Sequence, residues 1–254
     1  MIKNERQQEI LDILKEMGYV SVEELAKLTY SSTPTIRRDL NYLQEKGYLT
    51  RNHGGAILPL NPTSFIPSDL RTKLHANQKK LLCKEASKEL FDNCVVFINE
   101  SSTVQHLAEY LKDFKDVTVI TNSLTLCNKL TQYNVKFYCT GGQITHSNCF
   151  TGAHAERFIR RFNADLCFFS SHGIAKDGTI TGNIENEALI TSAMLEQSKK
   201  AIYLCDDSKV GLLANYNLAN VNTVDKIYTT ALPEAFELED KSNVIHVQVS
   251  KLDE

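Results

Sequence analysis

The sequence lacks any apolar run long enough to cross a bilayer, and its first residues are too polar for a signal peptide. We therefore expect a cytoplasmic protein with no membrane partner. The net charge of -3 excludes general attraction to nucleic acid, so DNA binding would need a local basic patch. The 254 residues suffice for one large globular domain, or for a small domain plus a medium one.

The sequence also lacks paired cysteines. Its seven cysteines are scattered and form no C-x-x-C motif, which disfavours both a disulfide framework and a zinc site. Several lie within apolar runs, so we expect reduced thiols in the protein core, as is usual in the cytoplasm. We predict neither a metal nor a cofactor.

The first 60 residues contain a pattern of three short helices. The first covers residues 5–17. Ser21 precedes the second, and Glu24 completes a capping box in which each side chain binds the other residue's backbone N–H. Ser32 caps the third. The apolar residues predicted to face the core are Ile10, Leu11, Ile13, Leu14 and Met17 in the first helix, Leu25, Ala26 and Leu28 in the second, and Ile36, Leu40 and Leu43 in the third.

A short hairpin is predicted directly after the third helix. Residues 48–51 resemble a strand, residues 52–55 a glycine-containing turn, and residues 56–58 a returning strand. Three helices followed by a hairpin are typical of a winged helix-turn-helix. We therefore predict a small α+β domain of this kind over residues 1–58.

The third helix would present a polar, basic face to DNA. In the major groove, arginine can pair with guanine and asparagine with adenine. From Lys27 to Arg51 the chain carries five basic residues against two acidic ones, a local net charge of +3. An isolated Arg-Arg-Asp is more often a solvated helix face with weak ion pairs, but the capped helix and the wing favour DNA binding. The candidate DNA-contacting residues are Lys27, Ser32, Thr33, Thr35, Arg37, Arg38, Asn41, Arg51 and His53.

Residues 59–74 form a predicted linker, because Pro59, Pro62 and Pro67 would keep this segment extended. From a helix near residues 75–90 onward, strand and helix patterns alternate. This alternation predicts a multidomain protein in which residues 75–254 form an α/β Rossmann-like domain with a mostly parallel sheet. The predicted buried strands are 95–98, 117–121, 135–139, 166–169, 201–205, 226–228 and 244–249, and the helices between them are 103–111, 124–132, 155–162 and 185–199.

Three loops at the carboxyl ends of predicted strands contain residues suited to binding phosphate. They cover 99–103, 121–123 and 140–143. Helix N-termini and glycine turns offer backbone N–H groups to an anion, and ligands of open α/β sheets bind at these strand ends. Each loop alone is more often a helix cap or a turn. Three of them on neighbouring strands together favour an anion site.

The amino-terminal motifs resemble those of DeoR-family bacterial transcription regulators. The resemblance is carried by Glu5-Arg-Gln-Gln-Glu-Ile-Leu, Val22-Glu-Glu-Leu-Ala, Thr35-Ile-Arg-Arg-Asp-Leu and Arg51-Asn-His-Gly-Gly-Ala. It runs nearly unbroken through the first 57 residues, with one departure, Tyr30-Ser31, in the turn between the second and third helices. The resemblance implies binding to double-stranded operator DNA as a homodimer or homotetramer.

The rest of the chain is similar to the effector domain of the same family. The matching segments are Thr121-Asn-Ser-Leu, Gly141-Gly, Thr151-Gly152, Gly173-Ile174, Glu187-Ala188 and Asp206-Asp-Ser-Lys209. That domain resembles sugar-phosphate isomerases and typically senses a phosphorylated sugar. The resemblance implies Asn99, Ser101, Ser102, Thr103, Asn122, Ser123, Gly141 and Gly142 around the phosphate, and Glu187, Asp206 and Lys209 toward the sugar.

The first loop departs from the family pattern. The family usually shows Asp-Ser-Gly-Thr-Thr, whereas this chain has Asn99-Glu100-Ser101-Ser102-Thr103. Thr191-Ser192 also replaces a basic residue common after the Glu-Ala motif, and His172 lies in another altered segment. The pocket would then either bind a different phosphorylated metabolite or have lost its effector.

The sequence leads to one main function and two alternatives. We predict a DNA-binding transcription regulator, a repressor of a sugar or polyol operon, relieved by a phosphorylated sugar in the second domain. One alternative is a sugar-phosphate isomerase with a DNA-binding head, although Asn99 removes one candidate acid–base residue. The other is a DNA-binding protein that needs no effector.

Overall fold

The computed structural model describes residues 5–17, 19–46, 48–52, 54–57, 71–72, 74–145, 147–236 and 241–249. The chain divides into two compact units, residues 1–74 and 75–254. The three prolines of the predicted linker lie outside the described residues, as does His53.

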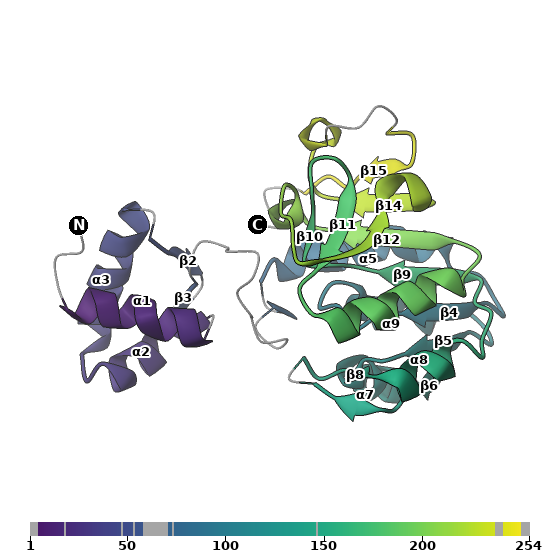
Figure 1. Cartoon of the computed structure of the whole chain (residues 1–254), viewed down its shortest axis with the longest axis horizontal. Coiled ribbons are helices and arrows are strands. Elements are labelled where there is room, and N and C mark those ends of the chain that lie inside the picture. Colours follow the sequence, from purple (N-terminus) through teal and green to yellow (C-terminus); the bar gives the residue numbers. More distant parts are fainter. Residues whose placement is uncertain are drawn as a thin grey trace. The chain divides into compact units, whose positions relative to one another are not determined.

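The first unit contains three helices and a small antiparallel sheet (Figure 1). The helices are α1 (Glu5–Met17), α2 (Val22–Leu28) and α3 (Thr33–Glu45). The sheet has the order β1-β3-β2, with β1 (Tyr19–Ser21), β2 (Thr50–Asn52) and β3 (Gly55–Ile57). The predicted helices and wing are confirmed, and β1 is an additional strand that the sequence analysis missed.

Side-chain caps begin two of these helices. The Ser21 hydroxyl accepts from the Glu24 N–H at 3.1 Å, and the Glu24 carboxylate accepts from the Ser21 N–H at 3.0 Å. The Ser32 hydroxyl accepts from the Thr35 N–H at 3.4 Å. Each cap satisfies a backbone donor that has no partner inside the helix, so both predicted caps are confirmed.

The core of the first unit holds most of the predicted apolar residues, including Ile10, Leu25, Ile36 and Leu40, all fully buried. Two predictions are wrong, because Met17 is 44% exposed and Leu28 is 45% exposed. Met17 is the last residue of α1, where neighbouring elements do not cover it. Leu28 is likewise the last residue of its helix, α2.

The second unit is built on a seven-stranded sheet, in which every neighbouring pair of strands is parallel (Figure 1). The strand order along the sheet is β15-β14-β12-β9-β4-β5-β6. The predicted Rossmann-like class is therefore confirmed. The strands are β4 (Val95–Ile98), β5 (Thr118–Thr121), β6 (Lys136–Cys139), β9 (Leu166–Phe169), β12 (Ala201–Cys205), β14 (Lys226–Thr229) and β15 (Val244–His246).

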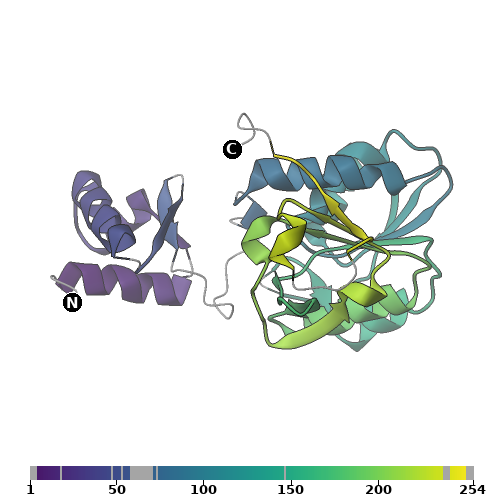
Figure 2. The ribbon, with the colours of Figure 1, turned by 90° about the horizontal axis from the view of Figure 1, so that it is seen from above.

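Helices cover both faces of this sheet (Figure 2). Alternating side chains of one strand divide between two apolar clusters, so that Val96 and Ile98 pack on one side and Phe97 on the other. The first side carries α5 (Ala76–Ala86), α6 (Ala108–Leu111), α7 (Leu124–Gln132) and the 3₁₀ turns η1 (Ser87–Glu89) and η2 (Val104–Leu107), and the second carries α8 (Ala153–Ile159) and α9 (Glu185–Glu196).

Two small sheets near the large one were not predicted. One is the hairpin of β7 (Gln143–Ile144) and β8 (Phe150–Thr151). The other is antiparallel and contains β10 (Gly173–Ile174), β11 (Thr179–Gly182) and β13 (Tyr216–Asn220). The remaining elements are the 3₁₀ turns η3 (Asp207–Lys209), η4 (Val221–Thr223) and η5 (Pro233–Ala235).

Two burial predictions need correction or refinement. Neither edge strand of the sheet is buried as predicted: the residues of β6 alternate between exposed and half-buried, and those of β15 are all half-buried. All seven thiols are free, and Cys139 at the end of β6 is half-buried while the other six are buried.

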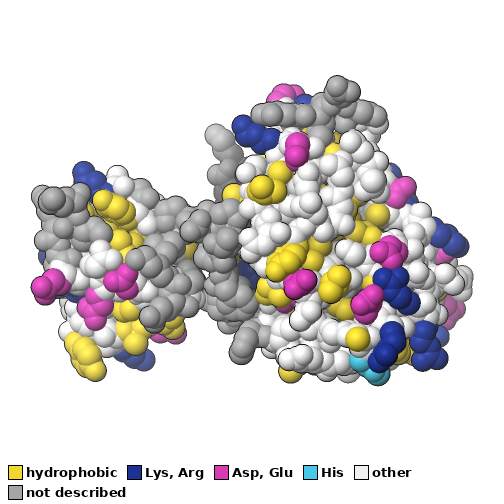
Figure 3. All heavy atoms as spheres, viewed as in Figure 1, with side chains coloured by type: hydrophobic (Ala, Val, Ile, Leu, Met, Phe, Trp, Pro, Cys, Tyr) yellow, Lys and Arg dark blue, Asp and Glu magenta, His cyan; other side chains and the backbone are white. Residues whose placement is uncertain are grey.

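No helix in the described part of the chain has the length and apolar character needed to cross a membrane. Charged side chains of both signs are interspersed on the visible face of the second unit (Figure 3).

Glu89, a half-buried acid, connects the helical layer to the sheet. Its carboxylate accepts from the Lys200 ammonium at 2.6 Å and from the Tyr228 hydroxyl at 2.8 Å, and it also binds Lys226. Burial opposes ionisation, but these donors outweigh it and lower the pKa of Glu89 from 4.5 to about 2.

We expect Glu89 to make the second unit sensitive to acid. Because its folded pKa is lowered, its contribution to stability is present above about pH 4.5 and is lost as the pH falls toward 2. Glu89→Gln should lower the melting temperature at pH 7 and flatten its fall between these pH values. Thermal unfolding followed from pH 7 to pH 2 measures this, and parallel curves for the two proteins would contradict it.

Candidate functional site

The outer face of α3 carries two arginines that remain available for a ligand. Arg37 and Arg38 are exposed, and among the described residues neither forms an ion pair or a side-chain hydrogen bond. Asp39 is only 7% exposed, and its carboxylate accepts from Arg6 Nε at 2.6 Å and Gln7 Nε2 at 3.0 Å. The acid next to the arginines thus joins α3 to α1, so this Arg-Arg-Asp segment is not a row of surface ion pairs.

The other candidate DNA-contacting residues lie on α3 or next to it. Ser32 and Thr35 bind each other at the start of the helix, with hydroxyl oxygens 2.9 Å apart, so both are engaged in the cap. Asn41 accepts a hydrogen bond from Arg51, which joins the middle of α3 to β2 of the wing. Of the other two, Lys27 is exposed near the end of α2 and Thr33 is half-buried at the first position of α3.

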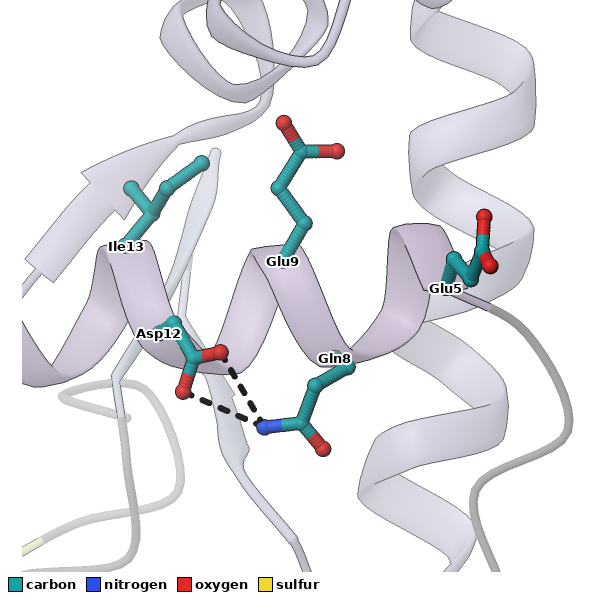
Figure 4. A pocket seen from close by; sticks show the side chains of 5 residues that line it. All are labelled: Glu5, Gln8, Glu9, Asp12 and Ile13. Atoms are coloured by element: carbon teal, nitrogen blue, oxygen red, sulfur yellow. Dashed lines mark hydrogen bonds between the residues drawn. The ribbon is translucent and has the colours of Figure 1, made fainter.

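The outer face of α1 has the opposite character. Glu5, Glu9 and Asp12 line a shallow depression together with Gln8 and Ile13 (Figure 4). The Gln8 amide donates to both Asp12 oxygens, at 3.1 and 3.2 Å. Three carboxylates repel a phosphate backbone, so the α1 face is unsuited to DNA and α3 with the wing is the basic side.

In the second unit, Asn99 joins the carboxyl ends of the two central strands. Its Nδ2 donates to the Ser170 carbonyl at 3.0 Å and to the Thr191 hydroxyl at 3.3 Å. Its Oδ1 accepts from the backbone N–H groups of Ser101, at 3.3 Å, and Ser170, at 3.4 Å. Asn99 and Thr191, two departures from the family pattern, therefore contact each other as a neutral pair.

Two lysine side chains lie beside the first loop, residues 99–103. Lys209 Nζ donates to Thr103 Oγ1 at 3.1 Å and to Ser170 Oγ at 2.7 Å. Lys79 on α5 is 3% exposed, and its Nζ donates to Ser102 Oγ at 3.3 Å. The sequence analysis missed Lys79, because a lysine inside an amphipathic helix belongs to no motif.

Asp206 lies at the same place, with one carboxylate oxygen 3.9 Å from Lys209 Nζ. Burial opposes its ionisation, but Lys209 and Lys79 outweigh this and hold the pKa of Asp206 below its usual value. The predicted residues Ser102, Thr103, Asp206 and Lys209 are thus brought together. Ser101 lies in the same loop, where its hydroxyl accepts from the Thr103 N–H at 3.0 Å.

The other residues predicted to bind phosphate do not lie beside the two lysines. Asn122 Nδ2 donates to the Glu100 carboxylate at 2.9 Å and to the Phe150 carbonyl at 3.3 Å. The Ser123 hydroxyl caps α7 by accepting from the Leu126 N–H at 3.1 Å. Gly141 and Gly142 have positive φ, and a Cβ on Gly142 would lie 2.6 Å from the Thr151 carbonyl oxygen. These residues surround a carboxylate and a tight turn, not the lysines.

Glu187 on α9 belongs to this second group. It is 4% exposed, and its Oε1 accepts from the Cys149 thiol and from the Thr145 hydroxyl, both at 3.5 Å. After burial itself, the Glu100 and Glu187 carboxylates are the main causes that raise the pKa of the Cys149 thiol. The site therefore has a cationic end near Lys79 and Lys209 and an acidic end near Glu187.

His172 is a further residue that the sequence analysis singled out. His172 is half-buried, and its Nδ1 accepts from the Asn183 N–H at 3.3 Å. Among the described residues, no three His, Cys, Asp or Glu side chains lie together in an arrangement suited to a metal ion.

A basic helix with a wing, joined in one chain to an α/β unit whose strand-end loops bring lysines and hydroxyl groups together, is typical of a ligand-sensing DNA-binding protein. Comparison with known families agrees. The DeoR-like helix-turn-helix domain matches residues 6–61, and the DeoR C-terminal sensor domain matches residues 74–231. The chain belongs to the DeoR family of transcription regulators, which confirms the family expected from its motifs.

Individual relatives are similar along nearly their whole length. The L-fucose operon activator of Haemophilus influenzae is 35% identical over 236 residues, which cover 91% of this chain and 94% of that protein. The glycerol-3-phosphate regulon repressor of Escherichia coli is 29% identical over 235 residues, covering 92% and 93%. Among solved structures, a ribose 5-phosphate isomerase from Plasmodium falciparum aligns with a TM-score of 0.40 and 16% identity, covering 56% of this chain and 54% of the isomerase. A likeness at that level does not bear on function.

The contacts of Asn99 predict the effect of restoring an acid at this position. Asn99→Asp replaces the donor to the Ser170 carbonyl with an oxygen, so this acceptor would face a buried carboxylate, whereas the Thr191 hydroxyl could turn and donate. We expect a loss of about 1–3 kcal/mol in the free energy of unfolding at pH 7, measured by urea denaturation. Asn163→Asp makes the same change at an exposed position and should be neutral. Equal effects of the two substitutions would contradict the assigned role of Asn99.

Proposed function

We propose that this protein is a cytoplasmic repressor whose α3 and wing bind operator DNA, and that a phosphorylated sugar or polyol in the second unit weakens this binding. The observation that carries the proposal is the pair of exposed arginines on α3, kept from ion pairing because Asp39 is bound to α1. The repressor direction has support in the name of the E. coli relative, whereas the H. influenzae relative is named an activator.

On this proposal, Arg37, Arg38 and Asn41 face base edges in the major groove. Thr33, the Ser32–Thr35 cap and Lys27 would contact backbone phosphates around the start of the helix. Arg51, from the wing, and His53, which lies outside the described residues, complete the phosphate contacts. A two-fold operator requires two such heads, so the proposal includes at least a homodimer, and a homotetramer is the larger alternative.

The DNA contacts can be separated by substitution. Arg38→Ala should reduce discrimination between operator and unrelated DNA by about 1–3 kcal/mol, because a guanine contact is lost. Arg51→Ala should weaken binding to every sequence alike, because a phosphate carries no sequence information. Fluorescence anisotropy on both kinds of DNA measures this, with exposed Arg157→Ala in the second unit as the control. Negligible effects of both head substitutions would refute this docking.

The effector's phosphate is proposed to lie at the cationic end of the crevice. Lys79 and Lys209 supply the charge, and Ser101, Ser102 and Thr103 supply hydroxyl and backbone donors. Asp206 offsets part of the charge of these two lysines, and the remaining positive charge is available to a phosphate. The neutral Asn99–Thr191 pair leaves this arrangement intact, which supports a functional site over a lost one.

Ligand binding at this end has a direct test. A phosphorylated sugar at about 100 times its dissociation constant should stabilise the protein by roughly 2.7 kcal/mol, seen as a higher melting temperature. Lys79→Met removes a buried ammonium group beside Ser102, so it should weaken binding roughly tenfold or more. Lys80→Met changes the exposed neighbour and should leave affinity unchanged. No shift with any phosphorylated sugar would favour the effector-independent alternative.

The enzyme alternative has less support. Isomerisation needs a placed acid and base, and the Asn99 carboxamide supplies neither. Incubation with pentose and hexose phosphates is the check, because turnover above background would contradict a purely regulatory role.

The function as a whole is tested by binding to the DNA upstream of the protein's own gene, with and without a sugar-phosphate panel. A repressor relieved by its effector should release that DNA when the sugar phosphate is added, whereas a protein that needs no effector should stay bound.

A further inference from the structure

Glu187 is a buried carboxylate without a cationic partner in the described part of the chain. Its Oε1 receives only two long hydrogen bonds, from a thiol and a hydroxyl, and its Oε2 receives none. Burying a carboxylate is unfavourable unless a positive charge or strong donors compensate for lost water. A carboxylate arranged in this way is suited to a cation supplied from outside the chain.

Other acceptors around Glu187 also lack donors. Asn122 Oδ1, Thr140 Oγ1 and Ser147 Oγ are buried and make no hydrogen bond with the described residues. They belong to the same part of the fold, since the Ser147 N–H donates at 3.2 Å to the Thr145 hydroxyl that binds Glu187. Asn122 pairs with Phe150, the residue after Cys149. A ligand rich in N–H or O–H donors would satisfy this group.

The two lysines near the strand ends form hydrogen bonds with residues other than Glu187. Lys209 binds Thr103 and Ser170, and Lys79 binds Ser102, all at the cationic end. Thr191, one turn after Glu187 on α9, is neutral and binds Asn99. The two ends of the crevice therefore differ in charge, which fits a ligand with an anion at one end and a cation at the other.

We propose that the effector is a phosphorylated amino sugar, whose protonated amine binds Glu187 while its phosphate binds near Lys79 and Lys209. The proposal rests on the proposed function and narrows the class of ligand at the same site. A sugar hydroxyl would give Glu187 a hydrogen bond but no charge. An ammonium group supplies the charge and three donors, enough for Glu187 and a neighbouring acceptor.

The test compares ligands that differ only in the amine. Calorimetric titration of the full-length protein uses glucosamine 6-phosphate against glucose 6-phosphate, and galactosamine 6-phosphate against galactose 6-phosphate. N-acetylglucosamine 6-phosphate, which carries no positive charge, and inorganic phosphate complete the set. In at least one pair the amino sugar should bind roughly tenfold or more tightly, as a charge-assisted hydrogen bond implies.

Glu187→Gln then identifies the group responsible. This substitution keeps the size of the side chain but removes its charge, so the preference for the amino sugar should fall to near unity while affinity for the neutral sugar persists. Glu185→Gln, an exposed change two residues earlier on α9, should retain the preference. A preference that survives Glu187→Gln would overturn the assignment.

The outcomes also separate this proposal from the broader one. If the two sugars of each pair bind with equal affinity, the proposed contact between the amine and Glu187 is wrong, while the proposed sensing of a phosphorylated sugar still stands. Binding of inorganic phosphate without any of the sugars also overturns the amino-sugar proposal. If neither the sugars nor phosphate bind, the effector function proposed above fails together with it.

Discussion

The proposed effector site depends on one topological constraint: β4 and β9 lie side by side, and the chain leaves them toward opposite layers of helices. After β4 it enters η2 and α6 on one face, and after β9 it reaches α9 on the other. Such a point leaves a crevice at the carboxyl edge of a parallel sheet. Asn99 and Lys209 both contact Ser170, which follows β9, so the loops after β4, β9 and β12 are held together by hydrogen bonds across this crevice.

Charge balance explains how this chain departs from its family pattern without losing the crevice. The family pattern has an acid in the first loop and a basic residue on the helix after the Glu-Ala motif, whereas here Asn99 and Thr191 form a neutral hydrogen bond. The charge of the two lysines next to Ser102 and Thr103 is offset only in part by Asp206. The remaining asymmetry is Glu187, whose second oxygen has no donor among the described residues. The departures are thus compatible with the proposed phosphate position, and they leave the Glu187 carboxylate without a positive partner among the described residues.

The sequence predicted the large sheet well because its strands are continuous apolar runs. It also predicted the caps at Ser21 and Ser32, since capping chemistry is local. It failed where structure depends on distant partners. The strands β7, β8 and β10 have only two residues each, too few to show a period, and β1 exists because Tyr19–Ser21 pairs with β3. Lys79 and the two-ended charge of the crevice likewise arise from side chains far apart in sequence, which no local pattern marks.

The proposed function requires that operator binding by the first unit and effector binding by the second unit be coupled. Coupling of two binding sites is reciprocal, so an effector that weakens operator binding must itself bind less tightly to the operator-bound protein, by the same factor. The most direct measurement is the effector's dissociation constant with and without saturating operator DNA. We expect saturating operator DNA to weaken effector binding roughly 5- to 150-fold, the same factor by which the effector weakens operator binding. Identical dissociation constants in the two conditions would contradict it.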